Sequence, residues 1–123
     1  MDAKVGQTAQ RTLTVTAESV ELFAQVFGDR NRLHFDADWT ARTRFGRLLA
    51  QGGIATGLLH TLVALDLPGP APVHIGATIT AHAEITWVHA SKPIARMDFR
   101  VVNQDADPVL TGEATVYQAS PED

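Results

Sequence analysis

The chain has 123 residues, of which 45% are hydrophobic and 20% charged, and its formal net charge is −4. This length predicts one domain over residues 1–123, because domains cluster at about 100–150 residues. The 10 Lys and Arg residues are scattered, so nucleic acid is not an expected partner. The absence of cysteine excludes disulfides, thiolate metal sites and a Cys nucleophile. Without a signal-like N-terminus or a run of about 18 apolar residues, we expect a cytoplasmic protein with no membrane partner.

The first half of the chain predicts a short strand followed by helices. Residues 11–15 alternate polar and apolar side chains, which is typical of a strand. Thr16 is suited to cap a helix over residues 17–27, and Asp36 a shorter helix over residues 37–42. One face of the longer helix is expected in the core and carries Val20, Phe23, Ala24 and Phe27.

A second, strongly apolar helix is predicted within residues 48–65. Because it is apolar on nearly every side, we expect it to be buried all round. Gly52, Gly53 and Gly57 would let a ligand or another backbone approach it closely. A proline-rich run at residues 68–72 ends the helix.

From Val73 onward the hydrophobic period changes to two. Strands are predicted from Val73 to Trp87 and over residues 94–102 and 109–117, with a turn at residues 103–108. We expect an antiparallel meander wrapped round the apolar helix, an α+β fold. One face of the first strand should carry the apolar series Ile75, Ala77, Ile79, Ala81, Ala83, Ile85 and Trp87.

The stretch Phe27-Gly28-Asp29-Arg30-Asn31-Arg32-Leu33-His34-Phe35-Asp36 carries the main chemical signal. Asp29 and His34 lie in a Gly-containing loop between two helices and can converge on one small volume. His is the side chain most easily poised for proton transfer near neutral pH, and a carboxylate can orient it or share the handling of a water. The alternative is a surface Asp and a His that caps a local helix.

This loop and the apolar helix resemble the MaoC-like (R)-specific enoyl-CoA hydratases, which have the hot-dog fold. The similarity extends over nearly the whole chain. The matching residues are Asp29, Asn31, Leu33, His34, Asp36, Ala41, Thr43-Arg44-Phe45-Gly46, Gly52, Ser91-Lys92-Pro93-Ile94-Ala95 and Thr111-Gly112-Glu113-Ala114.

The sequence also departs from this family at several positions. Phe27 and Arg32 replace a small residue and a proline of the motif, Gln51 replaces a His, and Gly57 stands where some members have a serine. Relatives have roughly one further strand between Leu67 and Val73, so we expect about four strands where relatives have five.

The resemblance implies a hydro-lyase that catalyses reversible syn hydration of a 2-enoyl thioester on CoA or a carrier protein. Asp29 and His34 would activate the water without metal or cofactor. A backbone N–H of Gly52 or Gly53 at the helix N-terminus would stabilise the thioester oxyanion. The alternative for the two glycines is close packing of the helix. Asn31 could contact substrate, or fix the loop backbone.

Other candidates are weaker. Arg44 and Arg47 belong to an arginine-rich stretch that could contact CoA phosphates or could be a solvated face. His60 is most simply a core residue. The spacing of the other histidines argues against a metal site; these are His74, His82 and His89.

Three classes of function therefore remain open. The first is the thioester hydratase or dehydratase, expected as a homodimer. The second is a repurposed dehydratase, isomerase or cyclase that acts on a natural-product intermediate. The third is a non-catalytic hot-dog binding protein, which retention of both Asp29 and His34 argues against.

Overall fold

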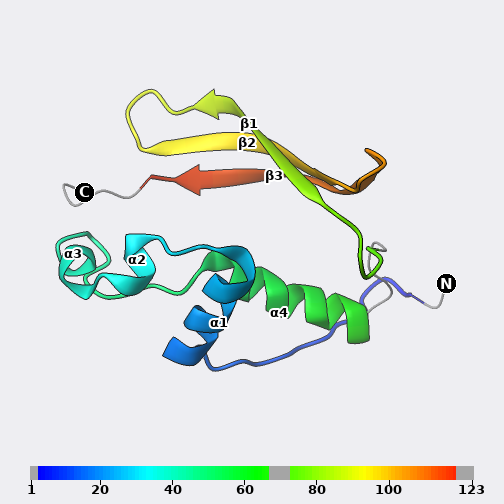
Figure 1. Ribbon diagram of the computed structural model, residues 1–123, viewed down its shortest axis with the longest axis horizontal. Helices are drawn as coiled ribbons and strands as arrows, with labels where there is room; N and C mark the ends of the chain where they lie inside the picture. Colours follow the sequence, from blue (N-terminus) through cyan, green and yellow to red (C-terminus); the bar gives the residue numbers. More distant parts are fainter. Residues whose placement is uncertain (1–2, 67–72, 119–123) are drawn as a thin grey trace. The chain divides into compact units, whose positions relative to one another are not determined.

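The computed structural model describes residues 3–66 and 73–118. It contains two compact units: a helical unit that holds α1 to α4 and a sheet unit that holds β1 to β3 (Figure 1). None of the helices in these ranges has the length and apolar composition needed to cross a bilayer.

Helix α1 (Ala17–Phe27) begins and ends where the sequence predicts. The Thr16 hydroxyl accepts from the Ser19 N–H while the Ser19 hydroxyl accepts from the Thr16 N–H, which forms a capping box. Gly28 ends the helix at φ +77°, a conformation that favours glycine. Ala24 is buried, but Phe27 is 70% exposed. The expected burial of Phe27 is therefore wrong, and its ring lies tilted against that of Phe23 on the same helix, with the centroids 4.6 Å apart.

Two short helices follow. Helix α2 (Arg32–Phe35) replaces part of the expected loop, because the Asn31 side chain accepts from the Leu33 N–H and caps it. Helix α3 (Ala37–Ala41) is capped by Asp36, whose carboxylate accepts from the Trp39 N–H at 2.9 Å. The predicted cap is confirmed.

Helix α4 (Gly52–Leu65) packs against α1. A Cβ on Gly53 would overlap the Phe23 ring, so this glycine permits the close approach of the two helices. None of the residues of α4 is buried in the single chain, so the expected burial all round is wrong there. Within the helical unit, α1 and the N-terminal segment cover only part of the apolar surface of α4.

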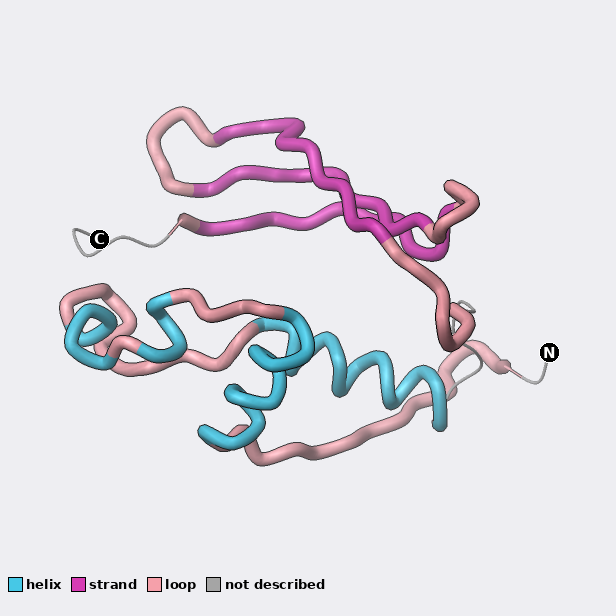
Figure 2. The backbone as a smooth tube through the Cα atoms, in the orientation of Figure 1, coloured by secondary structure: helices cyan, strands magenta, loops and turns pink. Residues whose placement is uncertain are grey.

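The predicted strand over residues 11–15 is also wrong. This segment forms no strand and runs instead beside α4 (Figure 2). The Arg11 guanidinium binds the Asp66 carboxylate at the end of α4, with N–O distances of 2.6 and 3.1 Å. Alternation of polar and apolar residues predicts an extended backbone, but a strand also needs a hydrogen-bonded neighbour. Residues 11–15 have no such neighbour among the described residues and are held by side-chain contacts instead.

The sheet unit is an antiparallel meander in the order β1-β2-β3, with β1 Thr80–Val88, β2 Ile94–Val102 and β3 Pro108–Tyr117 (Figure 2). Ala83, Phe99 and Gly112 lie opposite one another across the three strands. A Cβ on Gly112 would press on the Phe99 ring. The predicted second and third strands are confirmed within one residue.

The first strand is shorter than predicted. Gly76 adopts φ +92° and the Ala77 N–H donates to His74 O, so residues 74–77 form a turn. A bulge then lies between Ile85 and Trp87. Ile85 pairs with Met97 but Trp87 pairs with Arg96, so the expectation that Ile85 and Trp87 share a face is wrong.

The described residues form three strands rather than the expected four. The difference arises from residues 11–15, which do not join the sheet. The shortened connection at residues 68–72, where the sequence predicts that a strand is missing, lies outside the described residues.

Candidate functional site

Asp29 and His34 lie close together in the helical unit. The αL turn at Gly28 ends α1 just before Asp29, and α2 carries His34. The His34 Nε2 lies 3.6 Å from Asp29 Oδ2. The imidazole is only 10% exposed, whereas the carboxylate is 44% exposed. The pair therefore has one sheltered member and one that solvent reaches.

The second ring nitrogen of His34 fixes the orientation of the imidazole. His34 Nδ1 lies 2.8 Å from Leu49 O, and because a carbonyl can only accept, Nδ1 carries the hydrogen. The Leu49 N–H in turn donates to Leu33 O at 2.9 Å, which attaches this segment to α2. In the neutral imidazole, Nε2 is therefore the acceptor, and it is the nitrogen that lies toward Asp29.

Asp29 is held through both its side chain and its backbone. Its Oδ1 accepts from the Asn31 N–H at 3.2 Å, while its carbonyl oxygen accepts from Gln51 Nε2 at 3.3 Å. Oδ2, the oxygen near His34, has no hydrogen bond among the described residues. Asn31, a candidate for substrate contact, uses its side-chain oxygen to cap α2.

A cavity of about 400 Å³ adjoins His34 within the helical unit. Its charged member is Glu21, whose carboxylate makes two hydrogen bonds to the Arg30 guanidinium at 2.8 and 3.0 Å. These bonds lower the pKa of Glu21, so it stays ionised near neutral pH. The remaining wall is mostly apolar: Val15, Thr16, Ala17, Val20, Phe35, Leu48, Leu49 and Ala50. Such a cavity suits an acyl chain better than a charged ligand.

The first amides of α4 lie just beyond this cavity along the chain. No hydrogen bond from Gly52 N–H or Gly53 N–H is found within the described part of the chain, whereas Ile54 N–H donates to Gln51 O. The N-cap Gln51 makes no side-chain capping bond. Around Gly52 there is open space at the Cβ position, while Gly53 faces Phe23. Close packing therefore requires a glycine at position 53 but not at position 52.

The arginines near the loop have different surroundings. Arg30 and Arg32 form ion pairs with Glu21 and Asp36 at 2.8 and 3.0 Å. The Arg44 guanidinium lies over the Phe45 ring at 4.7 Å. Arg47, like Arg44, follows α3 and is exposed.

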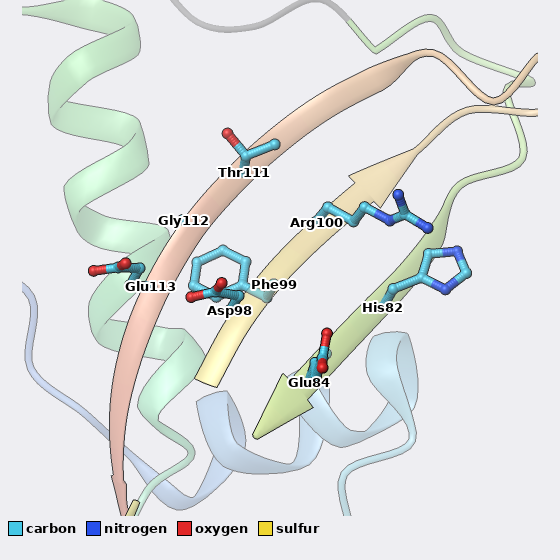
Figure 3. A pocket seen from close by; sticks show the side chains of 9 residues that line it. His82, Glu84, Asp98, Phe99, Arg100, Thr111, Gly112 and Glu113 are labelled. Atoms are coloured by element: carbon cyan, nitrogen blue, oxygen red, sulfur yellow. The ribbon is translucent and has the colours of Figure 1, made fainter. Parts of the chain in front are cut away.

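The sheet unit carries a wider hollow of about 670 Å³, which lies over a polar face (Figure 3). Strand register places Glu84, Asp98 and Glu113 in one row, next to a row formed by His82, Arg100 and Thr111. No group of three or more His, Cys, Asp or Glu residues suited to a metal ion occurs in residues 3–66 and 73–118. This hollow contains no base held by a backbone bond comparable to His34, so the helical cavity is the better candidate site.

Two contributors to the site were not predicted from the sequence. Leu49 acts through its carbonyl, which side-chain chemistry does not reveal. Gln51 was noticeable only as a departure from the family pattern, since its bonding partners are carbonyls of Val20 and Asp29, 31 and 22 residues away.

Comparison with known proteins gives consistent matches. Residues 2–105 match the family model described as a MaoC like domain. An (R)-specific enoyl-CoA hydratase of Aeromonas caviae is 33% identical over 92% of this chain and 93% of its own length. A mitochondrial 3-hydroxyacyl-[acyl-carrier-protein] dehydratase, FERN, of Solanum lycopersicum is 27% identical over 95% of this chain and 78% of its own length.

Among solved structures, the (R)-hydratase from A. caviae involved in PHA biosynthesis is similar over 97% of both chains, with a TM-score of 0.52 and 30% identity. This likeness confirms the α+β class and the hot-dog fold expected from the sequence.

Proposed function

Because the chain belongs to the MaoC-like domain family and is an enzyme of the hydratase and dehydratase type, we propose that it reversibly hydrates a 2-enoyl thioester. The thioester would be carried on CoA or on a carrier protein, as the names of the relatives suggest. The observation that carries this proposal is the position of His34 Nε2. It lies 3.6 Å from a carboxylate oxygen, next to a mostly apolar cavity.

The separation of the two groups allows one water to bind both of them. At 3.6 Å, Nε2 and Oδ2 are beyond the usual hydrogen-bond distance, and both accept when the imidazole is neutral and the carboxylate ionised. A water can donate one hydrogen to each acceptor. His34 and Asp29 would thus hold the nucleophile between them.

The reaction follows from this arrangement. The water oxygen forms a bond to C3 while His34 Nε2 takes one of its protons, and the electrons of the C2–C3 double bond move toward the thioester oxygen. The dyad then delivers a proton to C2 on the same face, which gives syn addition. In the dehydration direction the same groups remove the C2 proton and return a proton to the departing hydroxyl.

The developing oxyanion needs a hydrogen-bond donor, and Gly52 N–H fits that role. It lies in the first turn of α4, where the helix dipole favours negative charge. Gly52 also has no Cβ to obstruct a thioester, and nothing lies where one would be. Gly53 and Asn31 would contribute less directly, through helix packing and through the cap of α2.

We further propose that the helical and sheet units belong to one domain, since the family match runs from residue 2 to 105 and includes parts of both. The functional protein is proposed to be a cytoplasmic homodimer that works without metal or cofactor.

The test is an assay of crotonyl-CoA hydration, followed as loss of the enoyl absorbance. We expect turnover by the purified protein and an (R)-3-hydroxyacyl product. Turnover of a free enoyl acid with none of the thioester would instead support a repurposed enzyme. Binding of the thioester without turnover would support a binding protein.

A further inference from the structure

The Gln51 side chain connects three parts of the candidate site. It is only 2% exposed, and Nε2 donates to Val20 O of α1 at 3.0 Å and to Asp29 O at 3.3 Å. Its own backbone is the N-cap of α4. The Gln51 side chain thereby joins α1, the Asp29 backbone and the N-terminus of α4.

The hydrogen bonds of the Gln51 amide are not the ones that would stabilise the fold most. Both carbonyl partners require a donor, so Nε2 must lie toward them, and Oε1 is then buried without a partner in the described part of the chain. An N-cap Ser, Thr, Asp or Asn would instead bind the first-turn amides of α4 and stabilise the helix. Gln51 leaves those amides without a side-chain cap.

We propose that Gln51 is a positioning residue for this reaction. Its Nε2 holds the Asp29 backbone, which keeps Oδ2 at the correct distance from His34 Nε2, and its lack of a capping bond keeps Gly52 N–H open to the substrate oxygen. The inference rests on the proposed hydratase function, but the position of Asp29 can be measured without turnover.

The kinetic test is a double-mutant cycle between Gln51→Met and Asp29→Asn. Met preserves the side-chain length but removes the donor to Asp29 O. We expect Gln51→Met to lower kcat about 10- to 100-fold with little change in KM, as for a misplaced catalytic group. In the Asp29→Asn background, Gln51→Met should lower kcat less than about threefold, because the carboxylate that Gln51 positions is already lost.

Thr43→Val is the matched control. Thr43 is also buried, and its hydroxyl donates to Thr40 O at 2.7 Å, but it makes no bond to Asp29 or Gln51. This variant should lower the thermal midpoint with kcat near that of wild type. An unchanged kcat in Gln51→Met, or effects that multiply fully with those of Asp29→Asn, would overturn the proposal.

Backbone ¹⁵N relaxation provides a readout independent of activity. The order parameters of Asp29 and Arg30 should fall in Gln51→Met and stay at wild-type values in Thr43→Val. If no thioester is turned over, a fall at Asp29 still supports the positioning role, and unchanged values reject it. Should Gln51→Met not fold, the cycle and the relaxation measurement use Gln51→Leu, which also removes the donor to Asp29 O.

Discussion

The carbonyl of Leu49 determines which nitrogen of His34 can act as a base. By accepting from Nδ1 at 2.8 Å, it leaves Nε2 as the acceptor beside Asp29. The same bond limits rotation of the ring, so the imidazole is oriented before substrate arrives. Asp29 is more exposed, and its position depends on two bonds: the Asn31 N–H donates to its side chain, and the Gln51 side-chain amide donates to its carbonyl. The two members of the dyad are thus positioned by different means.

The two glycines at the start of α4 should respond differently to alanine. Gly53→Ala should lower stability by about 1–3 kcal/mol, because its Cβ would overlap the Phe23 ring. Gly52→Ala meets open space and should unfold close to the wild-type temperature. Thermal unfolding of both variants checks this difference. Equal destabilisation would show that Gly52 is also a packing glycine.

Bulk at Gly52 tests its proposed role in the reaction. Gly52→Val should fold but lower turnover, because its branched side chain would block approach of a thioester to the N–H. Steady-state kinetics on crotonyl-CoA provide the measurement. Turnover equal to that of wild type would remove Gly52 N–H from the mechanism.

Helix α3 is stabilised by an acid whose protonation should matter only at low pH. The bond from Trp39 N–H, and then the bonds from Arg32, lower the pKa of Asp36 below its ordinary value of 3.8. A carboxyl with a lowered folded-state pKa stabilises the protein above its unfolded pKa, and this contribution is lost as pH falls through the folded value.

Asp36→Asn should therefore lower the thermal midpoint at pH 7 and have progressively less effect as pH drops below about 4. The midpoints of wild type and variant between pH 7 and pH 3 give the comparison. Asp38→Asn is a control with the same charge change in the same helix. A difference that grows toward acid pH would contradict the assignment.

The segment after α3 should contribute to substrate binding if the substrate carries phosphates. Charge reversal at Arg44 or Arg47 is expected to raise KM more than it lowers kcat, since a remote phosphate contact is equally strong in ground and transition states. Lys4→Glu changes net charge equally at an exposed N-terminal position and serves as the control. Equal KM values for all three variants would favour a substrate without phosphates.

The helix caps, which local chemistry defines, could be predicted, whereas the bulge in β1 and the conformation of residues 11–15, which depend on distant contacts, could not. Thr16 and Asp36 cap helices through bonds to residues three positions away, so the sequence contains the whole signal. The bulge before Trp87 depends on how β1 pairs with β2, and residues 11–15 lack a strand partner. Periodicity alone specifies neither.

The same distinction applies to the candidate site. Asp29 and His34 could be proposed because they lie five positions apart in a recognisable motif. The Leu49 carbonyl and the Gln51 amide reach the dyad from 15 and 22 residues away. Their roles depend on which distant segments the fold brings together, and the pattern of residue types does not show this.

For the whole molecule, we expect a homodimer in solution. The exposed apolar side chains of α1 and α4 include Leu22, Val26 and Leu59, and such surface favours association. A sheet edge also exposes backbone donors and acceptors that proteins usually pair or cover. We predict that the partner subunit or residues 1–10 cover it. Mass measurement in solution checks the dimer, and a stable monomer would contradict it.

In the proposed mechanism, Asp29 and His34 together activate water at a 2-enoyl thioester. The most direct measurement is kcat/KM for crotonyl-CoA hydration by wild type, Asp29→Asn and His34→Ala, with folding of each checked by circular dichroism. We predict that each variant is folded and loses about 10²–10⁴-fold in kcat/KM. Folded variants that keep near wild-type kcat/KM would exclude these two residues from the mechanism.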